Sequence, residues 1–361
     1  MNILLSCAKK NLASLAVAVS LVGLVPASAL AQAPAPTNDR LFGIVEPVVA
    51  KKPLSLGLAL VHLNDDFWRG IAYGVEDEAK RSNVTLKRVF IAGAYGKVRE
   101  QFAQLQALRS LGVDVAVLGA VAFDGFDPAI RDLKQAGIRV MAAGIPVNSA
   151  SIDLGVGQDD SNIGKEMARQ LCAIDPAPKV AFVPGPAGAE WARLRVVGYK
   201  QELAAKCKPA KLVEAGFSAG IALQDGLTQA ADLLLKNPDV NAVYTPASSL
   251  AIGVAQAARQ ARRDVNLVTS AVNRESLKLL KEGRFKALVT EPGILMGRLI
   301  VQYAIRQSEG LPLDGVKKDG SLPYPYVMTP SLVVTSKNVD TFPVFQTDIV
   351  PEGWSSSALV R

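Results

Sequence analysis

The chain has 361 residues, of which 49% are hydrophobic, 20% charged and 6% aromatic, and its formal net charge is +7. This length exceeds one typical domain of roughly 100–200 residues, so we expect two packed domains, and the chain is too apolar to be disordered. The single histidine, His62, argues against a histidine-rich metal site or a histidine-dependent catalytic triad, and three cysteines exclude a scaffold stapled by many disulfides.

Basic side chains occur singly along most of the chain. The densest group, Arg259 with Arg262 and Arg263, lies at the end of one expected helix and has no aromatic residues between its members. Nucleic-acid binding favours a basic stripe or a recognisable motif. We therefore expect no nucleic-acid partner.

Residues 1–31 have the pattern of a cleaved secretory signal peptide. Lys9 and Lys10 precede an apolar run over 12–30, which closes with the small-x-small triplet Ala29-Leu30-Ala31. Serines and a proline interrupt the run, which argues against a transmembrane anchor. We expect residues 32–52 to form a leader and the mature chain to be exported to the periplasm without membrane insertion.

Short β-rich runs alternate with amphipathic helical stretches in the first half of the mature chain. The expected strands are 54–61, 84–91, 113–118 and 139–143, and the expected helices are 66–82, 97–111 and 128–135. This order is typical of a parallel sheet that helices cover on both faces.

The pattern restarts after an expected loop at 153–160. The expected helices are 162–172, 190–205, 223–236, 250–260, 274–281 and 296–308, and the expected strands are 179–183, 212–216, 241–244, 265–269, 287–290 and 327–334. We expect an α/β fold of two doubly wound parallel-sheet domains joined by a hinge. The first would comprise 53–155 and 292–310, and the second 156–291 and 311–361 with a hinge crossing.

Ligands of open α/β sheets bind beyond the carboxyl ends of the strands. Two facing units would enclose a small molecule between those ends. Cys172 lies at the end of one expected helix of the second unit, and Cys207 lies just after the end of another. A disulfide and two unpaired thiols both fit the sequence.

Four short stretches carry a resemblance to a known family. The loop Asn64-Asp65-Asp66-Phe67-Trp68, and the Gly185–Gly188 turn with Arg193-x-Arg195, resemble periplasmic sugar-binding proteins of the ribose-binding type. The segments Ala92-Gly-Ala-Tyr95-Gly96 and Pro351-Glu-Gly-Trp354 are similar to the TorT-like members of that superfamily. The resemblance implies the type I periplasmic binding protein fold. It also implies a receptor that binds trimethylamine N-oxide and presents itself to a TorS-like membrane histidine kinase.

Aromatic side chains are the first candidates for ligand contact. The resemblance carries Phe67, Trp68 and Tyr95 over as walls of a cage, in which cation–π attraction would hold methyl groups on a positive nitrogen. Trp191 is a further candidate at the start of a second-domain helix. The alternative is core packing, which suits Phe67 best because it begins an apolar helical face.

Polar candidates lie on the loops around the same expected cleft. Asp66, Gln158 and Asp159 could contact a ligand, although Asp159 also suits a helix N-cap. Arg193 matches the sugar-binder contact better than Arg195, and the two point to different faces of a helix. Glu291 follows a strand and would face the cleft.

The sequence favours a binding protein over an enzyme, since it holds no visible nucleophile with its base, metal cluster or cofactor loop. We therefore expect no catalytic residues, metal or cofactor. The alternative function is the sugar or polyol receptor of an ABC importer, with a permease as partner. The fold alone cannot decide between the two functions.

Overall fold

The computed structural model describes residues 41–208, 211–216 and 220–359, so the expected signal peptide lies outside the described residues. A six-stranded sheet forms the first lobe, in the order β11-β5-β4-β3-β1-β2. Its strands are all parallel: β1 (Ser55–Leu60), β2 (Thr85–Ile91), β3 (Val115–Leu118), β4 (Arg139–Gly144), β5 (Leu154–Gln158) and β11 (Tyr326–Thr329).

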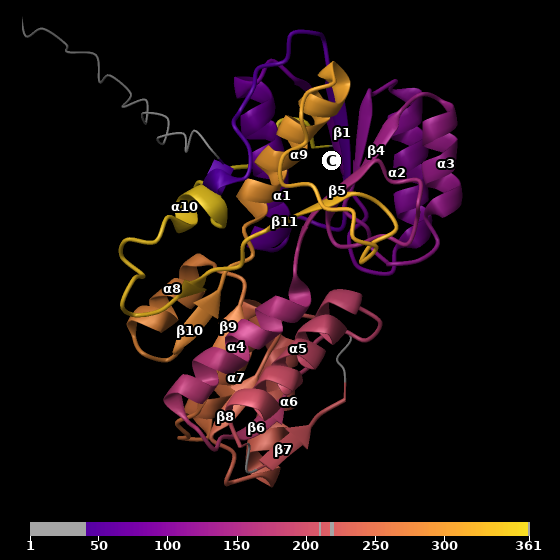
Figure 1. Cartoon of the computed structure of the whole chain (residues 1–361). Helices are drawn as coiled ribbons and strands as arrows, with labels where there is room; N and C mark the ends of the chain where they lie inside the picture. Colours follow the sequence, from indigo (N-terminus) through magenta and orange to yellow (C-terminus); the bar gives the residue numbers. More distant parts are fainter. Residues whose placement is uncertain (1–40, 209–210, 217–219, 360–361) are drawn as a thin grey trace, which may run out of the picture. The chain divides into compact units, whose positions relative to one another are not determined.

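Helices cover both faces of the first sheet (Figure 1). They are α1 (Asp66–Arg81), α2 (Val98–Ser110), α3 (Asp127–Gln135) and α9 (Gly293–Glu309), and a short 3-10 turn, η1 (Leu41–Gly43), precedes β1. α1 packs on α9, and α2 on α3. The fully buried strands β1 and β3 run between these helix pairs, as the continuous apolar runs of their sequences predict.

The second lobe repeats the arrangement with the order β12-β10-β9-β8-β6-β7. Its strands are β6 (Lys179–Phe182), β7 (Lys211–Glu214), β8 (Ala242–Tyr244), β9 (Asn266–Ser270), β10 (Ala287–Val289) and β12 (Val333–Val334), which alone pairs antiparallel. Its helices are α4 (Asp160–Ile174), α5 (Glu190–Lys206), α6 (Leu223–Lys236), α7 (Ser248–Gln260), α8 (Arg274–Lys281) and α10 (Val344–Thr347). The expected α/β class with two mainly parallel sheets is confirmed.

Two strands differ from expectation. β5 lies inside the expected 153–160 loop, and the single strand expected at 327–334 is two strands that belong to different sheets. Pro330 lies between β11 and β12 and has no backbone N–H to donate to a ladder. β5 and β11 pair with each other in the first sheet. The expected domain boundary at 155/156 is therefore wrong for β5, which continues to Gln158. The expected assignment of all of 311–361 to the second domain is wrong for β11.

Glycines bring α4 and α5 into close contact. A Cβ on Gly198 would lie 2.0 Å from the carbonyl oxygen of Ser161, and one on Gly164 would lie 2.1 Å from the carbonyl oxygen of Arg195. The two backbones therefore approach more closely than any larger residue permits. This approach places α5, and the Arg195 side chain on it, against the start of α4.

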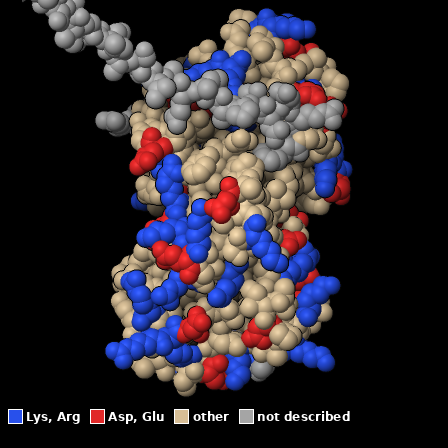
Figure 2. Space-filling model, turned by 90° about the vertical axis from the view of Figure 1, so that its left-hand side faces the viewer, with Lys and Arg blue, Asp and Glu red and all other residues tan. Residues whose placement is uncertain are grey.

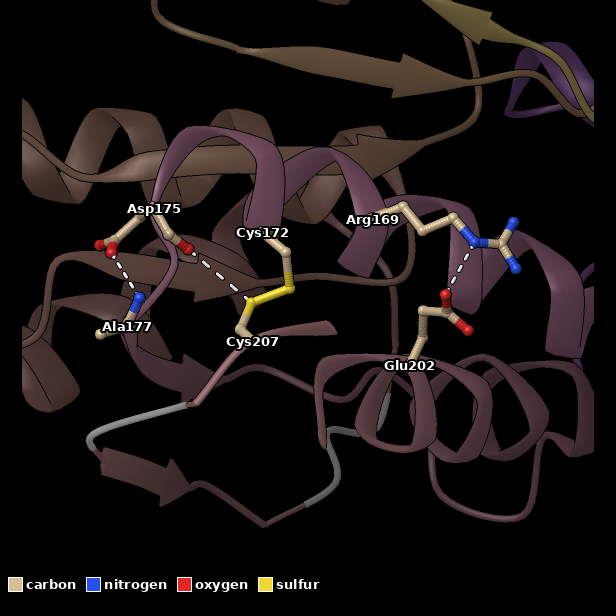
Figure 3. The surroundings of a disulfide bond; sticks show 6 residues. All are labelled: Arg169, Cys172, Asp175, Ala177, Glu202 and Cys207. Atoms are coloured by element: carbon tan, nitrogen blue, oxygen red, sulfur yellow. Dashed lines mark hydrogen bonds and ion pairs between the residues drawn. A yellow bond between two sulfur atoms is a disulfide. The ribbon is translucent and has the colours of Figure 1, made fainter. Parts of the chain in front are cut away.

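A disulfide joins the far ends of the same two helices (Figure 3). Cys172 and Cys207 have Cα atoms 5.4 Å apart, and Cys207 follows α5 directly. Nearby, Arg169 Nε on α4 donates a 2.8 Å hydrogen bond to Glu202 Oε1 on α5. The covalent bond settles the cysteine question that the sequence leaves open.

Basic and acidic side chains are interspersed on the face shown in Figure 2. Exposed ion pairs occur within helices of the described ranges, such as Lys236 with Asp232 at 2.8 Å. None of the helices in the described ranges combines the length and the apolar character needed to cross a membrane.

Candidate functional site

A cavity of about 160 Å³ lies among the loops beyond the carboxyl ends of strands from both sheets. An engineered cavity of about 150 Å³ takes up benzene, so this one suits a solute of similarly small size. The residues that line it are Asn64, Asp65, Asp66, Phe67, Tyr95, Ile145, Gln158, Trp191, Arg195, Ile221, Ala247, Ser248, Ser249, Ala271, Val272, Asn273 and Glu291. Six of the nine candidates from the sequence are among them.

Three aromatic side chains contribute to the wall. Phe67 comes from the first turn of α1, Tyr95 from the loop after β2, and Trp191 from the first turn of α5. The rings of Tyr95 and Trp191 are 6.4 Å apart between centroids and are tilted by 41°. Phe67 packs over Gly144, where a Cβ would lie 2.9 Å from the ring. Both lobes therefore supply aromatic surface to one small cavity.

Trp68 does not line the cavity, in contrast to the expectation. Its side chain is fully buried in the first lobe, and its ring fills the place that a Cβ on Gly119 would need. Its indole Nε1–H donates a 3.1 Å hydrogen bond to Tyr95 Oη. Trp68 thus lies behind the wall and orients Tyr95.

Arg195, and not the expected Arg193, lies at the site. Two helical residues that are two positions apart point in nearly opposite directions. Arg193 is exposed and pairs with Glu190 at 2.6 Å, whereas Arg195 is 2% exposed and lines the cavity. Its guanidinium lies 4.8 Å from the centre of the Trp191 ring.

Every N–H group of the Arg195 guanidinium donates a hydrogen bond to an acceptor within the protein. Nε and Nη2 both donate to Asp160 Oδ1, at 2.9 and 2.7 Å, and Nη2 also donates to Glu291 Oε2 at 2.9 Å. Nη1 donates to Glu291 Oε1, Ser270 Oγ and the carbonyl oxygen of Pro246. Since a guanidinium has five N–H groups, all five are committed here. Arg195 therefore positions Asp160 and Glu291 and has no N–H left for a solute.

Gln158 joins this network from the end of β5. Its Nε2 donates to Asp160 Oδ1 at 3.2 Å and to Glu291 Oε2 at 3.3 Å. Its Oε1 and the indole Nε1 of Trp191 are buried and find no hydrogen-bond partner within the described part of the chain. Two cavity-lining side chains thus keep unused hydrogen-bonding capacity.

Gln158 and Glu291 also lie where the chain passes between the lobes. Gln158 ends a strand of the first sheet and is followed by α4, while Glu291 lies between β10 of the second sheet and α9 of the first lobe. Asp348 Oδ1 accepts the backbone N–H of Glu291 at 3.0 Å. The polar side of the cavity is therefore built on the connecting segments.

Asp65 is a lining residue that the sequence analysis did not assign. It caps α1, because its Oδ1 accepts the Trp68 backbone N–H at 2.9 Å. Its Oδ2 lies 3.7 Å from Nε2 of His62. Burial raises the pKa of Asp65 to about 7, and burial lowers the pKa of His62. The available signal was the position of Asp65 directly before the first expected helix, since Asp is a preferred N-cap residue.

The remaining acidic candidates separate in the structure. Asp66 and Glu291 line the cavity. Asp159 instead caps α4 and accepts the Asn162 backbone N–H at 2.9 Å, and it is exposed. Asp159 is therefore a helix N-cap, which is the alternative that its sequence position also allowed.

Comparison with known proteins places this arrangement in a known group. The family described as "Periplasmic binding protein domain" matches residues 56–312. The crystal structure of a substrate-binding protein of a sugar ABC transport system, from Bordetella parapertussis, is 51% identical, with a TM-score of 0.85, over 88% of this chain and 100% of that one.

Two characterised groups are more distant relatives. The ribose import binding protein RbsB of Bacillus subtilis is 25% identical over 70% of this chain and 81% of its own length. The periplasmic protein TorT of Escherichia coli is 25% identical over 81% of each chain. Identity at this level is equal for the two, so it does not choose between them.

Proposed function

This chain belongs to the periplasmic binding protein family, and we propose that it is a periplasmic receptor for a small amine-type solute. The solute would occupy the cavity lined by Phe67, Tyr95 and Trp191. Trimethylamine N-oxide is the candidate that the TorT-like loops suggest. The receptor would report its occupancy to the periplasmic sensor domain of a TorS-like histidine kinase.

One observation carries the proposal: the cavity has aromatic walls, and the guanidinium of Arg195 beside them has no N–H free for a solute. Three aromatic side chains line the cavity, and every N–H of Arg195 is used inside the protein. Aromatic faces attract methyl groups on a positive nitrogen, by roughly 0.5–2 kcal/mol for each ring. A ligand carboxylate would find no free guanidinium here.

The oxide of trimethylamine N-oxide needs hydrogen-bond donors. The Tyr95 hydroxyl accepts from Trp68, which leaves its own proton available. Burial raises the pKa of Tyr95, so this hydroxyl keeps its proton at neutral pH. Trp191 lines the same cavity, and its buried indole N–H has no partner in the described ranges, so it is a second candidate donor.

Signalling requires that the solute favour one arrangement of the lobes over another. Gln158 and Glu291 line the cavity and lie on the connecting segments, so a bound solute would contact both lobes and their connections. A sensor domain that recognises the surface of the occupied form would then read this difference.

A sugar or polyol receptor of an ABC importer is the second candidate. The lining includes Asn64, Asp65 and Asn273, so it holds more carboxylate and amide groups than the sequence analysis recognised. Such groups bracket hydroxyls in ligand sites. The 51% identical relative from Bordetella parapertussis is itself described as a component of a sugar transport system.

Calorimetric titration of the exported chain with trimethylamine N-oxide and with D-ribose tests the proposal. We expect saturable binding of the amine oxide, lost in Tyr95→Ala and kept in Phe345→Ala, which removes an exposed aromatic outside the cavity. Binding of D-ribose alone would favour the importer. A co-precipitation with the kinase sensor domain, with and without solute, then tests the signalling role, and an interaction that does not change with solute would contradict it.

A further inference from the structure

We propose that the solute carries a net positive charge, as a small alkylated ammonium ion, and that Asp65 and Glu291 supply its counter-charge. This inference rests on the proposed function, in that the solute occupies the cavity of Phe67, Tyr95 and Trp191. It goes further, because trimethylamine N-oxide is dipolar and neutral overall, whereas the charges of this cavity favour a cation.

The charges around the cavity do not balance. In the described part of the chain, the lining carries three carboxylates, Asp65, Asp66 and Glu291, and one guanidinium, Arg195. Arg195 is shared between Glu291 and Asp160, which is itself buried. The group of Asp160, Arg195 and Glu291 therefore keeps one negative charge. Asp66 lies 3.8 Å from Arg69, so its charge is partly compensated.

Asp65 adds a second carboxyl group without a counter-charge; since its pKa is about 7, a bound cation would favour its ionised form. Its Oδ1 is used by the Trp68 backbone N–H, and within the described residues the one basic side chain near its Oδ2 is His62, at 3.7 Å. His62 is buried with a lowered pKa, so it does not supply a positive charge at neutral pH. The Asp65 side chain is 29% exposed, so a solute that displaced its water without supplying a counter-charge would impose a desolvation cost. An ammonium ion in the cavity would provide that counter-charge.

The aromatic residues point to the same class of solute. Alkylated ammonium ions are weakly hydrated and are recognised by aromatic faces together with carboxylates. Phe67, Tyr95 and Trp191 lie on the same cavity as Asp65 and Glu291. A neutral sugar would satisfy hydroxyl contacts but would leave both charges uncompensated. An anionic solute would add to them.

Choline and 3,3-dimethylbutan-1-ol, its neutral carbon isostere, form a matched pair of probes. Calorimetric titration should show choline binding about 10- to 100-fold more tightly, from one charge contact and the cation–π attraction together. Trimethylamine N-oxide and D-ribose complete the set. Equal binding of choline and its isostere, or binding of neither, would overturn the inference.

One substitution isolates the charge of Asp65 from its structural role. Asp65→Asn removes the charge but keeps an N-cap, since Asn and Asp cap helices about equally well. Asp159→Asn makes the same change at the N-cap of α4, outside the cavity. We expect Asp65→Asn to weaken choline binding about tenfold, to leave binding of the isostere unchanged, and to spare the thermal midpoint, whereas Asp159→Asn should leave choline binding unchanged.

The probes separate a failure of this inference from a failure of the proposed function. If trimethylamine N-oxide bound saturably and choline did not, the inference of a positively charged solute would be wrong, while the proposed function as an amine receptor would still hold. Binding of D-ribose alone would overturn both. If Asp65→Asn does not fold, the choline and isostere pair on the unmodified protein still decides the inference.

Discussion

The Trp68 indole N–H donates a 3.1 Å hydrogen bond to the Tyr95 hydroxyl, so a fully buried side chain orients a side chain of the cavity wall. The tryptophan belongs to the core of the first lobe, and the tyrosine lies on a loop. This contact links packing of the lobe to the geometry of the site.

Replacing Trp68 with phenylalanine should therefore weaken solute binding although Trp68 does not touch the cavity. The variant loses the hydrogen bond to Tyr95 and leaves space beside Gly119. We expect binding to weaken about 3- to 10-fold, since one neutral hydrogen bond contributes roughly 0.5–1.5 kcal/mol. Calorimetry measures the effect, and unchanged affinity would mean that Tyr95 is held in place without Trp68.

Replacing Arg195 with methionine should destabilise the fold strongly. The change leaves the carboxylates of Asp160 and Glu291 buried without their cation, which costs about 3–5 kcal/mol. Arg193→Met is the matched control, because it removes an exposed ion pair with Glu190 and should change stability by less than about 1 kcal/mol. Urea unfolding followed by circular dichroism measures both, and equal effects would contradict the assigned network.

Replacing Gly198 with alanine should push α5 away from α4. The added methyl would lie 2.0 Å from the Ser161 carbonyl oxygen, and overpacking of this kind typically costs about 1–3 kcal/mol. Gly216→Ala offers the control, because a Cβ there meets nothing within 4 Å. Solute binding should fall as well, since α5 carries Trp191 and Arg195. Thermal unfolding and calorimetry on both variants measure stability and solute binding. If Gly198→Ala changed neither, the two helices would have room for the added methyl group.

Binding of a cationic solute should strengthen as the pH rises from about 6 to about 8. Burial raises the pKa of Asp65 to about 7, so the carboxyl is mostly protonated and uncharged below this pH and ionised above it. For a single group with this pKa the ionised fraction, and with it the affinity, changes about tenfold over the interval. A cation held only by aromatic faces would bind equally at both pH values.

Asp65→Asn should remove this pH dependence. The control is needed because other ionisable groups lie nearby. Asp66 and Glu291 add negative charge to the region, Arg195 opposes it, and His62 contacts Asp65. Asp348 accepts the Glu291 backbone N–H, and burial raises the pKa of Asp348 to about 7. Titrations of choline across the same pH interval on both proteins measure it. A dependence that persists in Asp65→Asn would assign it to Asp348 or to Asp160, whose pKa burial raises to about 6.

The alternation of strands and helices was predictable because buried parallel strands and amphipathic helices leave strong periodic patterns. β1, α1 and α8 lie within one or two residues of their expected bounds. β5 was missed because Gly155 and Gly157 weaken a strand signal. Gly155 is required there by packing, since a Cβ would lie 2.6 Å from the Tyr324 ring.

The site was harder to predict than the fold because it depends on where side chains point. Loop position correctly indicated that Tyr95 and Glu291 face the cavity, since both follow strands. Arg193 and Arg195 could be told apart only by the rotation of α5, which the close contact of Gly164 and Gly198 sets. The resemblance placed Trp68 in the wall, whereas in the structure its ring packs in the core beside Gly119, which has no Cβ to occupy that space.

The most direct test of the account observes the wall of the cavity itself. The chain has three tryptophans, so an ¹⁵N-labelled sample should show three indole N–H resonances, which Trp191→Phe and Trp354→Phe assign. On titration with trimethylamine N-oxide and with choline, we predict a saturable shift of the Trp191 resonance and no direct shift of Trp354, which packs on Tyr73 outside the cavity. A Trp191 resonance that neither amine moves, and that D-ribose does move, would contradict the account.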